Sequence, residues 1–188
     1  LADSKKHTLS PSASGASVIG IKYKDGVIIA ADVLVSYGSL ARYTNFDRVA
    51  KVNDKTVLGC SGDVADFQLL LRYIQQQTLL DNLLNDALHS WITRVMYNRR
   101  SQFNPLWNTY IVGGVSNDNK PFLGYTFTEN CVATGFGAYL VAPTLRRFLD
   151  AKANGDPDQL SYEDALTAIK ESLLMLYYRD CRSETYAI

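Results

Sequence analysis

The chain has 188 residues, and its 19 basic and 19 acidic side chains give a formal net charge of zero. This balance argues against a sequence-independent nucleic-acid binder, which needs clustered excess positive charge. No apolar run approaches the roughly 18 residues that a membrane-spanning helix needs, so neither nucleic acid nor a membrane is an expected partner. One domain of this length can bury a sizeable core without disulfides or metals.

Cysteine and histidine usage gives no sign of a disulfide framework or a metal site. The three cysteines, Cys60, Cys131 and Cys181, are odd in number and widely spaced, unlike the paired cysteines of small secreted domains. Cys60 stands in a β-rich run, so we expect a buried, inert thiol there. No C-x-x-C pair occurs, and His7 and His89 are isolated, so we expect no metal and no cofactor. The cytoplasm and the nucleus are the expected compartments.

The sequence changes character at its first strands. Residues 1–14 are rich in serine and lysine, which predicts an extended or disordered leader and does not fit the apolar core of a secretory signal. β-Rich runs follow at 16–23 and 27–31, separated by Asp25-Gly26. This dipeptide favours a hairpin in which both turn residues take positive φ.

A second hairpin and two helices are predicted next. Residues 49–53 and 56–61 predict two paired strands around Asp54-Lys55. Helical spacing then predicts a helix whose apolar face holds Val64, Phe67, Leu70, Leu71 and Ile74. A second helix carries an apolar stripe of Leu88, Trp91, Ile92, Val95 and Tyr97. It ends in the basic pair Arg99 and Arg100, which suits a helix C-terminus.

The second half of the chain repeats this order. Residues 109–115 and 121–125 predict another strand pair, and residues 138–150 predict a third helix. Ser161, followed three residues later by Asp164, predicts the start of a last helix. The apolar face of that helix holds Ala165, Ile169, Leu173 and Leu176.

The order of these elements predicts the fold class. Strand and helix pairs alternate twice and are followed by a short strand at 186–188. Hairpins with segregated helix pairs favour an α+β layered sandwich over alternating βαβ units. The stretches 79–85 and 126–132 join their elements abruptly, and the final strand has no evident partner after it. We therefore expect one domain over residues 15–188, incomplete at its C-terminus and at internal loops, after the leader over 1–14.

Motifs along most of the chain resemble one protein family. The opening GASVIGIKYKDGVIIAAD at 15–32 resembles the start of proteasome β subunits. Six further motifs are similar, in order, to a non-catalytic member of that family: YGSLAR, SGDVADF, YNRRS, NPLWN, ATGFGAYL and LYYRDCRS. The resemblance implies the N-terminal-nucleophile hydrolase fold. This fold is a four-layer αββα sandwich, in which two antiparallel sheets lie between helix layers.

The resemblance also implies where the catalytic positions of the family fall. Active members use the hydroxyl of an N-terminal threonine as nucleophile and its α-amine as general base. That position falls on Ala16, which has no hydroxyl. The lysine position falls on Arg48, and the serine position in a glycine-flanked turn falls on Phe136, so both of these groups are lost as well. Gly62 stands where the family places its oxyanion-hole N–H.

Some positions of the family pattern are retained. They are Asp32, Gly62, Asp180 and Ser183. Each side chain among them also has a structural explanation. Asp32 can accept hydrogen bonds from turn N–H groups, and it would form an ion pair with Arg48 if the two lie within about 4 Å. Asp180 can pair with Arg179 and cap the last helix, and Ser183 can bond local backbone.

The resemblance implies a structural function. The chain would be a non-catalytic β subunit of the 20S proteasome core, part of the β ring and chamber wall in ubiquitin-dependent protein degradation. Its partners would be neighbouring β subunits, α-ring subunits and the opposite β ring, with assembly chaperones as further candidates. The sequence stops at Ile188, before the C-terminal tail that the resemblance implies.

Two alternatives remain open. One is an active N-terminal-nucleophile hydrolase of the threonine or serine type, in which Ser17 would replace the missing hydroxyl. A one-residue shift along a strand turns a side chain to the opposite face, so Ser17 should point away from Asp32 and Arg48. The other is a binding module outside the proteasome that has the same fold. The sequence lacks a glycine-rich phosphate loop, which argues against the nucleotide-binding form of such a module.

Overall fold

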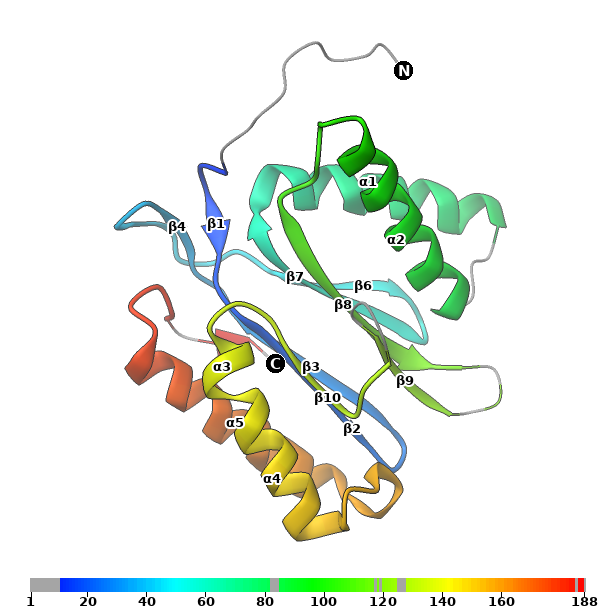
Figure 1. Ribbon diagram of the computed structural model, residues 1–188, viewed down its shortest axis with the longest axis vertical. Coiled ribbons are helices and arrows are strands. Elements are labelled where there is room, and N and C mark those ends of the chain that lie inside the picture. Colours follow the sequence, from blue (N-terminus) through cyan, green and yellow to red (C-terminus); the bar gives the residue numbers. More distant parts are fainter. Residues whose placement is uncertain are drawn as a thin grey trace.

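The computed structural model of the chain describes residues 11–81, 85–116, 118, 120–124, 128–184 and 186–187. Two antiparallel sheets pack face to face, and helices cover the outer face of each sheet (Figure 1). The arrangement confirms the α+β class and the αββα sandwich that the resemblance implies. Within the described residues, no helix has the length and apolar character needed to cross a membrane.

The larger sheet joins strands that lie far apart in the sequence. Its hydrogen-bonded order is β5-β4-β1-β7-β8-β9, and β6 pairs with β7. Its strands are β1 (Ser14–Gly15), β4 (Val35–Tyr37), β5 (Leu40–Tyr43), β6 (Val49–Asn53), β7 (Thr56–Asp63), β8 (Asn108–Val115) and β9 (Pro121–Gly124). Both strand pairs predicted for this part of the chain are confirmed within the described residues. The sequence patterns do not predict β1, β4 or β5.

The smaller sheet contains the first predicted hairpin. Its order is β10-β2-β3-β11, with strands β10 (Cys131–Ala133), β2 (Val18–Tyr23), β3 (Gly26–Asp32) and β11 (Tyr186–Ala187). Tyr23 pairs with Gly26, so the two turn residues are Lys24 and Asp25. Neither Asp25 nor Gly26 has positive φ. The predicted turn is therefore wrong, because Gly26 already belongs to the strand ladder.

The helices form the two outer layers. Helices α1 (Val64–Asp81) and α2 (Asn85–Ser101) pack against β7 and β8, whereas α4 (Ala142–Ala153) and α5 (Tyr162–Arg179) pack on the smaller sheet. The short helical elements are α3 (Gly137–Leu140) and the 3-10 helix η1 (Pro157–Gln159). Ser161 Oγ accepts a hydrogen bond from the Asp164 N–H at 3.1 Å, so the predicted start of α5 is confirmed.

The single helix predicted over 138–150 is wrong, because the segment contains two helices. Val141 ends α3 and also precedes the first residue of α4. Pro143 stands in the first turn of α4. Proline has no N–H to donate to the carbonyl four residues earlier, and its ring crowds that carbonyl. The chain therefore starts a new helix at this point.

Tyr97 departs from the apolar stripe predicted for α2. Leu88 and Ile92 are buried as predicted, but 66% of Tyr97 is exposed. Tyr97 follows Leu88 by nine residues, which is two and a half turns of a helix with 3.6 residues per turn. It therefore lies on the opposite face from Leu88.

The two sheets approach closely between the helix layers. The apolar residues that meet there are Val18, Ile29, Ala31, Ile111, Leu123 and Val132. A Cβ atom added at Gly59 would lie 2.6 Å from Val18 Cγ1 and 2.9 Å from Ile29 Cγ2. Glycine therefore allows β7 to approach β2 and β3 at this point, and the sheets stay close where the chain crosses between them.

Several sequence predictions fall wholly or partly outside the described residues. They concern residues 1–10 of the leader, 82–84 and 126–127 in the two abrupt joins, residue 125 at the end of a strand, and residue 188 of the last strand.

Candidate functional site

The chain crosses from β1 in the larger sheet to β2 in the smaller one (Figure 1). Residue 16 lies in this crossing. On its N-terminal side, Gly15 pairs with Val35 of β4 and with Gly62 of β7. On its C-terminal side, β2 begins at Val18 in the other sheet. The chain therefore reaches Ala16 directly from a strand that is paired on both sides.

The residues just before β1 also bond to the sheet. The Ser12 N–H donates to Asp63 Oδ1 at 3.3 Å, and the Val64 N–H donates to the Ala13 carbonyl at 3.0 Å. Residues 12–15 are therefore part of the folded structure. The leader is expected to be extended or disordered, and its last residues are extended. They bond to β4, β7 and the start of α1.

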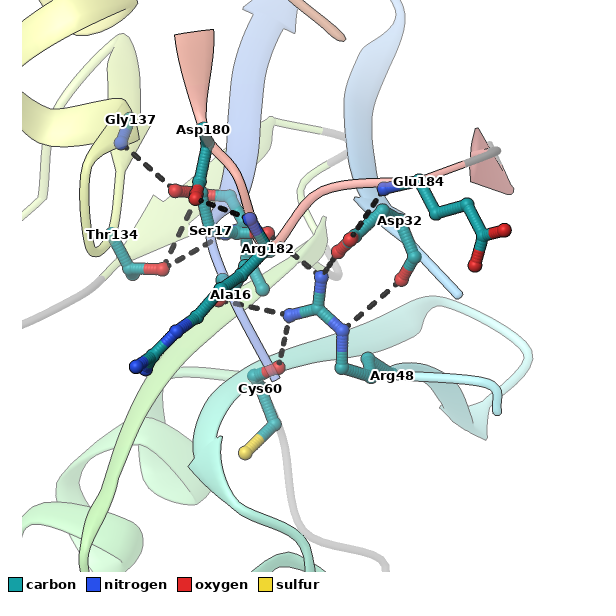
Figure 2. Close-up of polar contacts among 11 residues, drawn as sticks. Ala16, Ser17, Asp32, Arg48, Cys60, Thr134, Gly137, Asp180, Arg182 and Glu184 are labelled. Atoms are coloured by element: carbon teal, nitrogen blue, oxygen red, sulfur yellow. Dashed lines mark hydrogen bonds and ion pairs between the residues drawn. The ribbon is translucent and has the colours of Figure 1, made fainter. Parts of the chain in front are cut away.

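The guanidinium of Arg48 lies against the backbone of residues 16 and 17, and it forms hydrogen bonds with several surrounding groups (Figure 2). Only 3% of the residue is exposed. Nε donates to the Asp32 carbonyl at 3.1 Å, and Nη1 donates to the carbonyls of Ala16 at 3.0 Å and Cys60 at 3.2 Å. Nη2 donates to the Ser17 carbonyl at 3.0 Å and to Asp32 Oδ1. All five N–H groups of an arginine side chain therefore have an acceptor.

The predicted ion pair between Arg48 and Asp32 is confirmed. Asp32 is also buried, and its second carboxylate oxygen accepts from the Glu184 N–H at 3.3 Å. Burial lowers the pKa of Arg48 to about 10, partly opposed by the negative charge of Asp180. The guanidinium therefore stays charged near neutral pH. It has no lone pair that could take a proton from a nucleophile.

The retained residues near the end of α5 have local structural roles. The Asp180 N–H donates to the Leu176 carbonyl at 2.7 Å and ends the helix. Asp180 Oδ1 accepts from the Arg182 N–H at 3.0 Å, so its carboxylate caps the following turn, and the described ion pairs do not include one with Arg179. The Ser183 N–H donates to the Asp180 carbonyl at 3.1 Å; this bond does not involve the hydroxyl, so the expected role of the Ser183 side chain stays a prediction.

Ser17 points away from the Arg48 side chain and toward the turn before α3. Its Oγ accepts from the Gly137 N–H at 2.9 Å (Figure 2). Thr134 Oγ1 accepts from the Val18 N–H at 2.9 Å beside it. The sequence marks Gly137 only as one of the two glycines that flank Phe136, and no pattern in it points to Thr134. Neither residue can act as a base for Ser17, because a threonine hydroxyl and a backbone amide are too weakly basic.

Gly62 and Phe136 line the outer side of the same site. Gly62 has φ of +95°, and a Cβ atom there would clash with the Trp107 carbonyl, so only glycine fits. Gly135 has φ of +58°, and it places Phe136 at the start of α3 with 61% of the residue exposed. The position that the family pattern assigns to a serine therefore carries an apolar ring toward the outside.

A cavity of about 270 Å³ opens beside residue 16. Its lining includes Gly15, Ala16, Gly62, Phe136, Asp180 and Arg182. None of the described lining residues is a lysine, a histidine or a cysteine, so a hydroxyl placed there would have no nearby side-chain base apart from the Asp180 carboxylate. Asp32, Arg48 and Ser183 belong to the predicted site but do not line this cavity.

Cys60 is a buried thiol within a hydrogen-bond network. Asn108 Nδ2 lies 3.4 Å from its Sγ atom, and Tyr110 Oη donates to Asn108 Oδ1 at 2.9 Å. Burial raises the pKa of the Cys60 thiol, partly opposed by the charge of Arg48. The expected inert thiol is confirmed in its burial, and a raised pKa keeps it in the unreactive protonated form. In the described parts of the chain, no cluster of three or more His, Cys, Asp or Glu side chains could hold a metal ion.

A comparison with known families decides the assignment. A family model described as proteasome subunit matches residues 12–187. The chain belongs to the proteasome subunit family. The match begins at the residue whose N–H makes the first described hydrogen bond to the larger sheet.

Relatives from distant organisms extend this proteasome-family match. A proteasome subunit beta type-4 from Xenopus laevis is 49% identical and covers 95% of this chain and 76% of its own length. The beta type-4 subunit of Arabidopsis thaliana is 42% identical over 95% of this chain and 74% of its own length. The beta type-7 subunit of Saccharomyces cerevisiae is 41% identical over 94% and 72%.

Proposed function

We propose that this chain is a non-catalytic β subunit that helps to build the 20S proteasome core without an active site of its own. The observation that carries the proposal is the chemistry at residue 16. Ala16 has no hydroxyl, and its carbonyl is held by Arg48. A covalent mechanism of the N-terminal-nucleophile type needs both a hydroxyl and a free amine.

Membership of the family means assembly with other proteasome subunits. We further propose that the partners are neighbouring β subunits, the α ring and the opposite β ring, with assembly chaperones acting before completion. Exposed apolar side chains on separate faces support several interfaces. They include Tyr37, Leu40 and Tyr43 on the β4–β5 hairpin and Leu174, Tyr177 and Tyr178 on α5. The proposed compartments are the cytoplasm and the nucleus.

The mass of the native complex tests the assembly. The tagged chain is expressed in its source cells, and the purified complex is weighed intact by native mass spectrometry. We expect a particle of many different subunits with two copies of this chain. A single copy would contradict a complete core and indicate a half-assembled form. A monomer or a homo-oligomer would overturn the proposed function.

A covalent probe tests the absence of catalysis in the same particle. A peptide epoxyketone reacts with a residue that carries both a hydroxyl and a free α-amine. We expect adducts on other subunits of the particle and an unchanged intact mass for this chain. An adduct on this chain would contradict the non-catalytic assignment, and peptide mapping would show whether Ser17 carries it.

The alternative of a Ser17-dependent hydrolase has less support. Ser17 Oγ accepts from the Gly137 N–H, and its carbonyl accepts from Arg48. The side chain thus faces α3, while Arg48 and Asp32 lie on the other side of the backbone (Figure 2). Activity through Ser17 would require β2 to shift by one residue, which would expose its buried face.

A further inference from the structure

We propose that Arg48 is a positioning residue that clamps the chain on both sides of residue 16. In this role, Arg48 keeps residues 12–15 as a permanent part of the larger sheet, and a hydroxyl restored at position 16 alone would not become a nucleophile. The inference goes beyond the proposed function, because it concerns bonds within one chain and holds whatever the chain assembles with.

The guanidinium of Arg48 joins segments of both sheets. Arg48 lies just before β6 and bonds to carbonyls at the β1–β2 crossing, at the end of β3 and in β7. These acceptors belong to both sheets. One rigid, planar group therefore holds the two sheets together at the point where the chain passes between them.

Arg48 has no unbonded N–H group that could bind a substrate or a reacting group. Each of its N–H groups has an acceptor, four of which are backbone carbonyls. Two of those carbonyls belong to Ala16 and Ser17, so a shift of either residue would leave a buried donor without a partner. An unpaired donor beside a buried charge is costly, and the backbone at residue 16 is held in place for this reason.

The side chain of Arg48 also contacts β1. A Cβ atom added at Gly15 would clash with Arg48 Cδ and lie 2.9 Å from Nε. The Gly15 backbone thus packs directly against the arginine stem while β4 and β7 pair with it on either side. Gly15 is therefore held by the Arg48 side chain on one side and by two paired strands at its edges, while the cavity opens beside it.

Hydrogen exchange of the purified complex tests the clamp. In the unmodified complex, we expect the amides of residues 14–17 to exchange as slowly as those of β7. Arg48→Lys keeps the charge but has three donors on a flexible stem, and it should speed exchange over residues 12–17 by about tenfold or more. Unchanged exchange in this variant, or fast exchange of residues 14–17 in the unmodified complex, would overturn the proposal. The measurement on the unmodified complex does not depend on whether the variant folds.

Two matched variants separate a local clamp from general stability. Ile169→Val trims the core under α5, where Ile169 is fully buried, and it should lower the melting temperature without selective exchange at residues 12–17. Arg146→Lys changes an exposed arginine that pairs with Glu129 at 2.7 Å, and it should leave both readouts unchanged. If Ile169→Val caused the same local increase in exchange, the effect of Arg48→Lys would reflect a general loss of stability. That result would contradict the clamp.

A restored hydroxyl gives an independent test. We expect the chain carrying Ala16→Thr to keep its full mass in the complex and to form no adduct with a peptide epoxyketone. A new N-terminus at position 16, or an adduct there, would overturn the clamp. An adduct on the unmodified chain would instead contradict the proposed function, so the two failures can be told apart.

Discussion

The two sides of residue 16 have very different surroundings. On the inner side, Arg48 and Asp32 are almost completely buried, and every arginine donor is bonded. On the outer side, Phe136 lines the cavity with 61% of its residue surface exposed, and Tyr139 on α3 is 80% exposed. Buried charges must stay paired or the fold is destabilised, whereas exposed positions tolerate change. The inner side therefore holds the strictest requirement of the site, a buried charge that must stay paired.

The strongest test of this contrast removes the buried charge. Arg48→Met should destabilise the chain by about 3–5 kcal/mol, because Asp32 would remain buried without its partner. Co-expression with the unmodified chain, followed by mass spectrometry of the assembled complex, would measure how poorly the variant is incorporated. Adding Asp32→Leu should restore part of the loss, since both charges are then gone. If Arg48→Met and the unmodified chain were incorporated equally, the inner side would tolerate change as well as the outer side does.

A pair of glycine variants compares two positions at the cavity: Gly62 packs against backbone, whereas the nearest neighbour of Gly135 is a side-chain oxygen. Gly62→Ala should cost about 2–3 kcal/mol, because the new Cβ would clash with the Trp107 carbonyl at a φ that alanine rarely adopts. Gly135→Ala should cost only about 1 kcal/mol, the usual penalty for alanine in the left-handed region. Its nearest neighbour, Ser17 Oγ, lies 3.2 Å from the added atom. Thermal melting of the purified complex, read by protease resistance of this chain, should rank the two in this order.

The buried thiol on the inner side predicts a loss of stability at high pH. Burial raises the pKa of Cys60 above its ordinary value of 9.0, so folding favours the protonated thiol. This contribution is complete below about pH 9 and is lost as the pH rises above it, with a slope of at most about 1.4 kcal/mol per pH unit.

Melting temperatures between pH 8 and 11 would measure this effect. Cys60→Ala should flatten the curve in part, because burial also raises the pKa of Tyr110. Cys181→Ala is the control, since Cys181 is exposed, and it should leave the curve unchanged. An identical slope in Cys60→Ala and the unmodified chain would show that the thiol contributes nothing to the alkaline loss.

The smallest effect is expected on the outer side. Phe136→Ser should change stability by no more than about 0.5 kcal/mol, because most of the ring is exposed. It should also leave the intact mass and probe labelling of the chain unchanged. Melting of the purified complex measures the first expectation. A loss of 2 kcal/mol or more would mean that the ring is buried against a neighbouring subunit, and the outer side would no longer count as tolerant.

The sequence predicts the parts of this fold that depend on local pattern. The β2–β3 pairing, the start of α5 at Ser161 and the helices α1 and α2 follow from short-range spacing and capping. Strand β1 could not be predicted in this way, because two residues carry no periodicity. They form a strand only because they pair with β4 and β7. The break between α3 and α4 could have been predicted from Pro143.

The candidate site shows the same division. The pairing of Arg48 with Asp32 could be predicted, because opposite charges at family positions are visible in the sequence. The four carbonyls that complete the guanidinium shell could not, because every residue has a carbonyl and nothing in the sequence marks the ones that converge. The outward direction of Phe136 likewise depends on the φ of Gly135, which no side-chain pattern reveals.

Strand β1 has a mechanical consequence. It lies antiparallel between β4 and β7, and the next residue is held by the Arg48 side chain. A pull on the chain ahead of residue 12, directed along β1, would shear both ladders at once and could not peel one bond at a time. The start of this domain should therefore resist extraction by force more than the length of β1 suggests, and its resistance should end abruptly once the guanidinium contacts break.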